Sequence, residues 1–110
     1  MTPDGRYVGA VTEARLTLNG ESLGDLHEVR PDMPWFEARF IPTDAFAAVE
    51  PLFREEREAA ERPELDAQAW QSLWERIWAE GVALVLPDGT VVERDFAVHL
   101  YEDGTARFRY

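Results

Sequence analysis

The stretch from Trp35 to Thr43 constrains the fold of this chain most strongly, because the periodicity of the sequence changes there. From Trp35 to Ile41, the residues of one face are all apolar and those of the other face are mixed, a period of two that is typical of a half-buried strand. Pro42 has no N–H group to donate to a strand ladder, and Thr43 favours the N-terminal cap of a helix. We therefore expect a strand that gives way to a helix within two residues.

Two further strands are expected before this change. Residues 7–18 and 21–29 contain alternating apolar residues, and Asn19-Gly20 between them is a strong signal for a tight hairpin turn. The apolar spacing shifts near Gly24, which predicts a β-bulge. A loop over residues 30–34 should then lead into the third strand.

Two helices are expected after the change. Residues 43–62 carry an apolar stripe at helical spacing, and Pro51 either kinks this helix or begins a new one. Residues 66–80 place apolar side chains on one helical face, between Asp66 as the N-terminal cap and Gly81 as the stop. This second helix is the most strongly specified element of the chain.

The last part of the chain, residues 82–110, is predicted to be a β-meander with one long strand over residues 91–101. The whole chain would then be a single domain, with a three-stranded unit (1–42), a helical pair (43–81) and the meander. The order β-β-β-α-α-β-β-β indicates an α+β domain. We predict an antiparallel sheet of about six strands with both helices packed on one face, and two smaller three-stranded sheets are the alternative.

The charge of the chain narrows the chemistry it can perform. The sequence has 22 acidic residues against 11 basic ones, a formal net charge of −11. It contains no lysine and no cysteine, which excludes lysine bases, Schiff bases, cysteine nucleophiles, disulfides and thiolate metal sites. The negative charge argues against direct binding to nucleic acid, and it permits attraction to a basic partner.

The sequence also predicts where the protein is located. No apolar run approaches the roughly 18 residues that a membrane-spanning helix needs. The first residues include both charges and lack the apolar core of a signal peptide. The absence of cysteine fits a reducing compartment. We therefore expect a cytoplasmic protein that does not bind membranes.

Three tryptophans, Trp70, Trp74 and Trp78, lie on one face of the second predicted helix. They could form an exposed platform for a sugar or a partner, or the seam of a homodimer. Each indole can bury roughly 150–250 Å² of surface, and a small domain can hardly leave all three exposed. We therefore expect this stripe to be core.

The two histidines, His27 and His99, show no local spacing that is typical of a metal site. His27 could meet Asp32, and His99 could meet Asp95, across a sheet. A single histidine on a strand is most often a hydrogen-bonded or surface residue. The sequence therefore predicts no catalytic residue, no metal ligand and no cofactor.

A binding surface can be proposed where aromatic and charged residues cluster. The third strand presents a mixed face, and the charged end of the first helix carries several acids. The candidate binding residues are Trp35, Glu37, Arg39, Glu55, Glu58 and Glu61. The alternative interpretations are that the aromatic residue belongs to the core and that the acids form a solvated helix face.

Three functional hypotheses follow from these observations. The first is a non-enzymatic protein-interaction domain that binds another protein or forms a homodimer. The second is an acidic inhibitor of a basic partner, such as an immunity protein or a nucleic-acid mimic. The third is a small-ligand-binding domain or enzyme with a pocket between helices and sheet, and it requires an enclosed polar cavity near His27 or His99.

Overall fold

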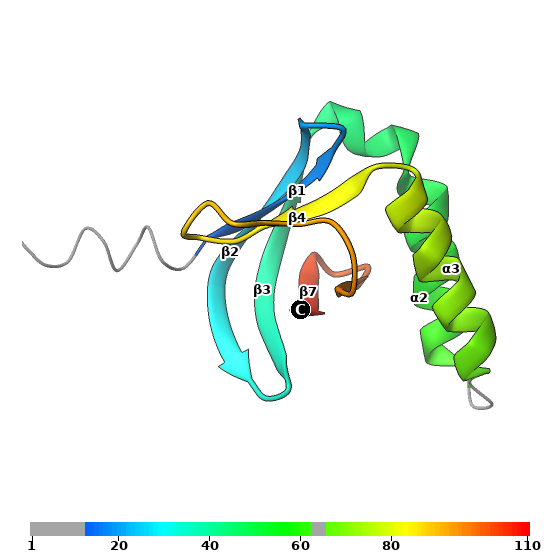
Figure 1. Cartoon of the computed structure of the whole chain (residues 1–110). Coiled ribbons are helices and arrows are strands. Elements are labelled where there is room, and N and C mark those ends of the chain that lie inside the picture. Colours follow the sequence, from blue (N-terminus) through cyan, green and yellow to red (C-terminus); the bar gives the residue numbers. More distant parts are fainter. Residues whose placement is uncertain (1–12, 63–65) are drawn as a thin grey trace, which may run out of the picture.

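Seven strands form one antiparallel sheet in the computed structural model, which describes residues 13–62 and 66–110 (Figure 1). Their order across the sheet is β5-β4-β1-β2-β3-β7-β6. The strands are β1 (Ala14–Leu18), β2 (Glu21–Asp32), β3 (Trp35–Pro42), β4 (Val82–Val85), β5 (Val91–Val92), β6 (Ala97–Leu100) and β7 (Thr105–Arg109). The single sheet excludes the alternative of two smaller sheets, and it has one strand more than the predicted number of about six. The first part of the strand predicted over residues 7–18 lies outside the described residues.

Two α-helices, α2 (Glu50–Glu61) and α3 (Ala67–Ala79), lie side by side against one face of the curled sheet (Figure 1). A short 3-10 helix, η1 (Asp44–Ala48), connects β3 to α2. The predicted α+β arrangement is confirmed. Pro51 lies in the first turn of α2, so of the two predicted alternatives the new helix is the correct one.

The segment 82–110 is not the predicted β-meander. At one edge of the sheet β4 pairs with β1 and β5 pairs with β4, whereas β6 pairs with β7 at the other edge. The predicted long strand over residues 91–101 is broken between Val92 and Ala97, where Asp95 has a φ of 63°. The chain therefore crosses from one edge of the sheet to the other at this break, and this crossing accounts for the seventh strand.

The two predicted N-terminal caps behave differently. The Asp66 carboxylate accepts hydrogen bonds from the backbone N–H groups of Gln68 and Ala69, as expected. Thr43 makes no side-chain cap, because its hydroxyl donates to the backbone oxygen of Ser22 at 2.6 Å. This hydrogen bond ties the end of β3 to the start of β2.

The hairpin between β2 and β3 is longer than predicted. The register shift opposite Gly24 confirms the bulge expected there. A second shift lies between His27 and Arg30, around Glu28 with a φ of 57°. The loop predicted over residues 30–34 shrinks to a two-residue turn, because β2 continues to Asp32. The extended hairpin places Asp32 beside β7, next to the site described below.

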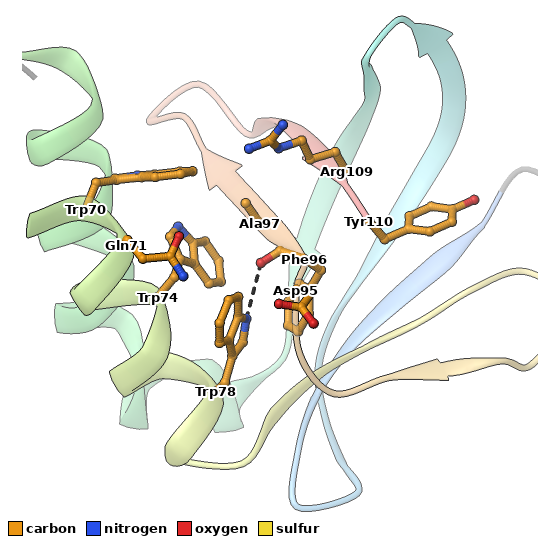
Figure 2. Close-up of a pocket in the computed structure, with 9 residues that line it drawn as sticks. All are labelled: Trp70, Gln71, Trp74, Trp78, Asp95, Phe96, Ala97, Arg109 and Tyr110. Atoms are coloured by element: carbon orange, nitrogen blue, oxygen red, sulfur yellow. Dashed lines mark hydrogen bonds between the residues drawn. The ribbon is translucent and has the colours of Figure 1, made fainter. Parts of the chain in front are cut away.

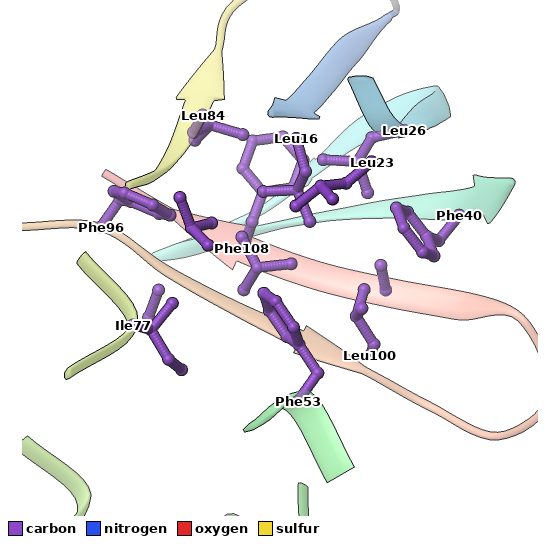
Figure 3. Packing of buried hydrophobic residues seen from close by; sticks show 14 of the residues in the cluster. Leu16, Leu23, Leu26, Phe40, Phe53, Ile77, Leu84, Phe96, Leu100 and Phe108 are labelled. Carbon is purple, nitrogen blue, oxygen red and sulfur yellow. The ribbon is translucent and has the colours of Figure 1, made fainter. Parts of the chain in front are cut away.

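The hydrophobic core lies between the curled sheet and the helical pair. Figure 3 shows Phe53 of α2 and Ile77 of α3 pointing toward sheet residues such as Leu16 and Phe108. Trp74 belongs to this cluster and is 1% exposed, as the core interpretation predicts. In the part of the chain that the structure describes, no helix has the length and apolar character needed to cross a membrane.

Candidate functional site

A groove of two adjoining cavities lies between the helical pair and the sheet edge formed by β6 and β7. The first cavity, the His99 chamber, has a volume of about 430 Å³ and is open to solvent. The second cavity, the Trp74 chamber, has a volume of about 270 Å³ (Figure 2). Both are lined by Trp70 and Arg109, which makes them neighbours. The His99 chamber is further lined by Trp35, Glu56, Glu61, His99, Tyr101 and Arg107, and the Trp74 chamber by Trp74, Trp78, Asp95 and Phe96.

Glu56 lies in the wall of the His99 chamber and is 1% exposed, the only buried carboxylate among residues 13–62 and 66–110. It follows the buried Phe53 by one helical turn, so the face of α2 that covers the sheet carries it inward. Its Oε2 accepts a hydrogen bond from Trp70 Nε1 at 3.0 Å, and its Oε1 lies 3.1 Å from His99 Nδ1. A buried carboxylate is tolerated only when its oxygens have such partners.

His99 extends from β6 toward α2, and its orientation is fixed by Glu56. When Glu56 is ionised, it can only accept hydrogen bonds, so the proton between the two groups sits on His99 Nδ1. The other ring nitrogen, Nε2, faces the rim of the chamber, 3.7 Å from Glu61 Oε2. A carboxylate that fixes one nitrogen leaves the other free to exchange a proton or a hydrogen bond with a ligand.

Two arginines of β7 give the groove positive charge. The guanidinium carbon of Arg107 lies 5.9 Å from the centre of the Trp35 ring, and that of Arg109 lies 5.2 Å from it. Arg107 is also paired with Asp32 at 2.6 Å, although its buried Nε has no hydrogen-bond partner. Among the described residues, no carboxylate oxygen lies within 4.0 Å of the Arg109 guanidinium. Arg109 is therefore an available cation in a chain of strongly negative charge.

The predicted binding residues of β3 separate into two locations. Trp35 lines the His99 chamber. Glu37 and Arg39 line a different cavity on the outer face of the sheet, which shares only Tyr101 and Arg107 with the His99 chamber. The alternating pattern of β3 predicts that Trp35, Glu37 and Arg39 share one face of the strand. The groove reaches only Trp35, the first residue of β3.

The predicted acidic residues of α2 also separate. Glu61 lines the His99 chamber, opposite Trp35. Glu55 is paired with Arg76 of α3 at 3.5 Å, and Glu58 is exposed and lines none of the cavities described above. The structure thus brings Trp35 and Glu61 together and leaves the other four residues elsewhere.

The predicted partners of both histidines are wrong. The Nδ1 atom of His27 lies 3.0 Å from Glu13, and its Nε2 atom lies 3.9 Å from Asp25. Asp32 cannot meet His27 across the sheet, because β2 continues to Asp32 and both residues lie on that one strand. His99 meets Glu56 rather than Asp95, because β6 begins only after Asp95. The third hypothesis required an enclosed polar cavity near His27 or His99. The cavity at His99 is open and lined by both polar and apolar side chains, so that condition is not met in the form in which it was stated.

Sequence reasoning missed Glu56, the central polar residue of the groove. The available signal was its spacing: Val49, Phe53, Glu56 and Ala60 follow each other by three or four residues, so they share one helical face. The run of charged residues around Glu56 obscured that position. Trp70 and Trp78 were expected in the core but are only half-buried, because they form the groove wall.

Within the described residues, no group of three histidine or carboxylate side chains is arranged to hold a metal ion. No protein-family model, curated protein or solved structure matches the chain.

Proposed function

We propose that the protein binds a small planar carboxylate in the groove. This proposal is the ligand-binding version of the third functional hypothesis. The observation that carries the proposal is Arg109, a guanidinium that lines both chambers and has no carboxylate partner among the described residues. A guanidinium matches a carboxylate with two parallel hydrogen bonds. In a chain with twice as many acids as bases, an arginine left without such a partner favours an anionic ligand.

The walls of the groove support a planar ligand. Trp35 and Trp70 supply flat apolar surfaces, and Tyr101 adds a third ring to the His99 chamber. His99 and Arg107 add a small number of polar groups that converge on the same space. A cavity of a few hundred cubic ångströms with aromatic walls and convergent polar groups is typical of small-molecule sites.

We propose binding rather than catalysis, and a cytoplasmic location. No serine, threonine, lysine or cysteine is among the described residues that line the two chambers, so the groove lacks a hydroxyl nucleophile of serine or threonine, an amine nucleophile and a thiol nucleophile. The absence of cysteine from the whole chain supports the proposed location. The Glu56–His99 pair would then serve to hold a hydrogen-bonding group in place.

The proposal can be tested with benzoate as the probe and benzamide as its neutral counterpart. Amide chemical shifts of the full chain are followed by NMR during each titration. We expect benzoate to shift the amide signals of residues around the groove. Benzamide should bind far more weakly, because only benzoate can form an ion pair with Arg109. Arg109→Gln should weaken benzoate binding by about ten-fold or more, the usual effect of losing hydrogen bonds to a charged group.

Arg15→Gln is the matched control, because Arg15 is a strand arginine on β1, paired with Asp25 outside the groove. It should leave benzoate binding unchanged. Equal weakening by both variants would indicate general electrostatic attraction and contradict a site at Arg109. Shifts confined to residues outside the groove would contradict the proposal as well.

A second candidate is the protein-interaction role, in which the protein binds a basic protein as an inhibitor or forms a homodimer. The observation that favours it is Met33, which is 78% exposed at the tip of the β2–β3 hairpin, two residues from Trp35. A basic partner captured at low salt and lost at high salt would support the inhibitor form. A dimer seen by sedimentation that Met33→Asp dissociates would support self-association, and a monomer without a captured partner would contradict both.

A further inference from the structure

The Nε2 atom of His99 is accessible and makes no hydrogen bond with any described residue. The nearest carboxylate oxygen is Oε2 of Glu61 at 3.7 Å, which is beyond hydrogen-bond distance. Among the side-chain nitrogen and oxygen atoms of the buried and half-buried residues described, only Trp74 Nε1 and Arg107 Nε lack both solvent contact and a hydrogen-bond partner. Because His99 Nε2 has no partner and is not one of these two atoms, it is in contact with solvent.

The accessible nitrogen opens onto the His99 chamber. The other ring nitrogen, Nδ1, points inward at the buried carboxylate of Glu56, 3.1 Å away. Glu61, whose carboxylate is the neighbour of Nε2, lines the chamber and has a side chain that is 56% exposed. His99 lines neither the Trp74 chamber nor the cavity on the outer face of the sheet. A ligand that fills the His99 chamber therefore meets Nε2 rather than Nδ1.

The groups around Nε2 determine which kind of ligand group fits beside it. Glu56 holds the imidazole proton on Nδ1, so neutral His99 presents Nε2 as an acceptor. The ionised carboxylate of Glu61 is also only an acceptor. Two acceptors that face one space favour a ligand group that donates a hydrogen bond. They disfavour an anionic group there, because Glu61 would repel it.

His99 and Arg109 are spaced to contact two ends of one ring. β6 and β7 pair so that His99 lies opposite Arg107, and Ala97 lies opposite Arg109. His99 and Arg109 are therefore diagonal neighbours on one face of the sheet, a relation that places residues roughly 7–8 Å apart. Figure 2 shows the Arg109 side chain extending from β7 toward Trp70. A benzene ring with a polar group at each end spans such a gap.

We infer that the ligand is a planar carboxylate with a neutral hydroxyl group at its other end, and that His99 Nε2 accepts the hydrogen bond of this hydroxyl. The inference rests on the proposed function, in which Arg109 holds the carboxylate. It gives the buried pair a specific role, because Glu56 keeps the proton on Nδ1 and thereby keeps Nε2 an acceptor. His99 is thus the residue that selects a hydroxylated ligand.

The test compares probes that differ in one substituent. 3-Hydroxybenzoate and 4-hydroxybenzoate carry the donor at positions where it cannot pair with the carboxylate of the same molecule. 3-Fluorobenzoate and 4-fluorobenzoate carry an atom of similar size there that cannot donate. Affinities are measured by NMR titration of the full chain. The ring nitrogens of its two histidines are followed in ¹H–¹⁵N spectra, and His27→Gln assigns the signals of His99.

We expect at least one hydroxybenzoate to bind about five-fold more tightly than the fluorobenzoate with the same substitution, the usual worth of one neutral hydrogen bond. His99 Nε2 should give the signal of an unprotonated nitrogen in the free protein at neutral pH, and this signal should move upfield when that probe binds. The nitrogens of His27 are the internal control and should not move, because His27 lines neither chamber.

The double variant Glu56→Gln/His99→Phe removes the acceptor without leaving a charge buried alone. The introduced amide retains an oxygen for the N–H of Trp70. In this variant, each hydroxybenzoate should bind no more tightly than its fluorobenzoate counterpart. Because both probes are measured on the same variant, a general loss of affinity cancels from their ratio. A five-fold preference that survives in the variant would contradict the role of His99.

Failure of this inference and failure of the proposed function can be distinguished. If hydroxybenzoates and fluorobenzoates bind equally in an Arg109-dependent manner and the Nε2 signal stays in place, the carboxylate site stands and the hydroxyl inference is wrong. If none of the probes binds, the proposed function fails together with this inference. A proton on His99 Nε2 in the free protein would also overturn the inference, because a protonated nitrogen cannot accept a hydrogen bond.

Discussion

His27 and His99 both lie next to carboxylates, but His27 is partly exposed to solvent and His99 is buried. Each has a nitrogen within about 3 Å of one carboxylate and a second carboxylate somewhat farther away. The side chains of His27 and Glu13 are 35% and 54% exposed, whereas those of His99 and Glu56 are 10% and 1% exposed. Water can therefore replace the partners of His27, but it cannot replace Glu56, the buried partner of His99. The comparison shows that burial, and not the pairing of residue types, distinguishes the candidate site.

Burial also changes what each pair contributes to stability. An exposed ion pair is worth about 0–1 kcal/mol. A buried pair carries a desolvation cost that often cancels its attraction, so it stabilises a fold less than well-packed apolar residues would. Removing one partner of a buried pair is nevertheless costly, because the other partner stays buried alone. The Glu56–His99 pair is thus poorly explained by stability and well explained by a role in the groove.

The largest difference between the two regions should appear when one carboxylate is removed. Glu56→Ala leaves His99 and the Trp70 N–H without their acceptor, and we expect the free energy of unfolding to fall by about 3–5 kcal/mol. Glu13→Ala removes the equivalent partner of His27 and should cost less than about 1 kcal/mol. Urea unfolding measures both values. Similar losses for the two variants would contradict the distinction.

A smaller effect should separate two donors on the same helix. Trp70→Phe removes a hydrogen bond to a carboxylate, and Trp78→Phe removes one to a backbone oxygen. Both substitutions delete the same atoms from half-buried rings, so the volume lost is matched. We expect Trp70→Phe to cost about 1 kcal/mol more, because hydrogen bonds to charged groups are worth about 1.5–3 kcal/mol against about 0.5–1.5 kcal/mol for neutral ones. A larger cost for Trp78→Phe would contradict the expectation that the Trp70–Glu56 hydrogen bond is the stronger of the two.

The smallest effect concerns Glu50, the exposed counterpart of Glu56 on α2. A hydrogen bond from Arg54 holds the pKa of Glu50 below its ordinary value. Because the pKa is lowered by folding, the contribution of Glu50 to stability is present at neutral pH and is lost as the pH falls through the folded-state pKa. Arg54→Ala should raise the pKa of Glu50 back toward its ordinary value in an NMR titration.

Asp88 is the control for that titration. Its pKa is lowered by hydrogen bonds from Thr90, which lies far from Arg54 in the chain. The pKa of Asp88 should be the same in the Arg54→Ala variant as in the unaltered protein. An unchanged pKa of Glu50 would show that Arg54 does not hold it in solution.

The sequence predicted those parts of the fold that depend on neighbours along the chain. The helix from Asp66 to Gly81 combines a cap, an apolar stripe and a left-handed stop, and all three are local signals. Val91 and Val92 indicate a change of apolar phase near Glu93, but such a change looks the same for a bulge and for a crossing to the other edge of the sheet, so the crossing between Val92 and Ala97 was not predicted. That choice is decided by strand pairing.

The candidate site was harder to predict for the same reason. Glu56 and His99 are 43 residues apart, and Arg107 and Asp32 are 75 residues apart. Each residue in isolation looks like an ordinary charged surface residue. Trp35 and Glu61 were predicted in the binding surface because their own surroundings are aromatic or acidic, whereas Glu56 acquires its role only from the residues that bury it.

The central claim is that the hydrogen-bonded trio of Glu56, Trp70 and His99 serves the groove rather than the fold. Its most direct test is the free energy of unfolding of the triple variant Glu56→Met/Trp70→Phe/His99→Leu. We predict a value within about 1 kcal/mol of the unaltered protein, because the apolar replacements avoid the cost of burying charge. We also predict weaker benzoate binding, because His99 is one of the polar groups that converge on the cavity. A fall of about 3–5 kcal/mol, as large as that expected for Glu56→Ala, with benzoate binding retained would contradict the claim.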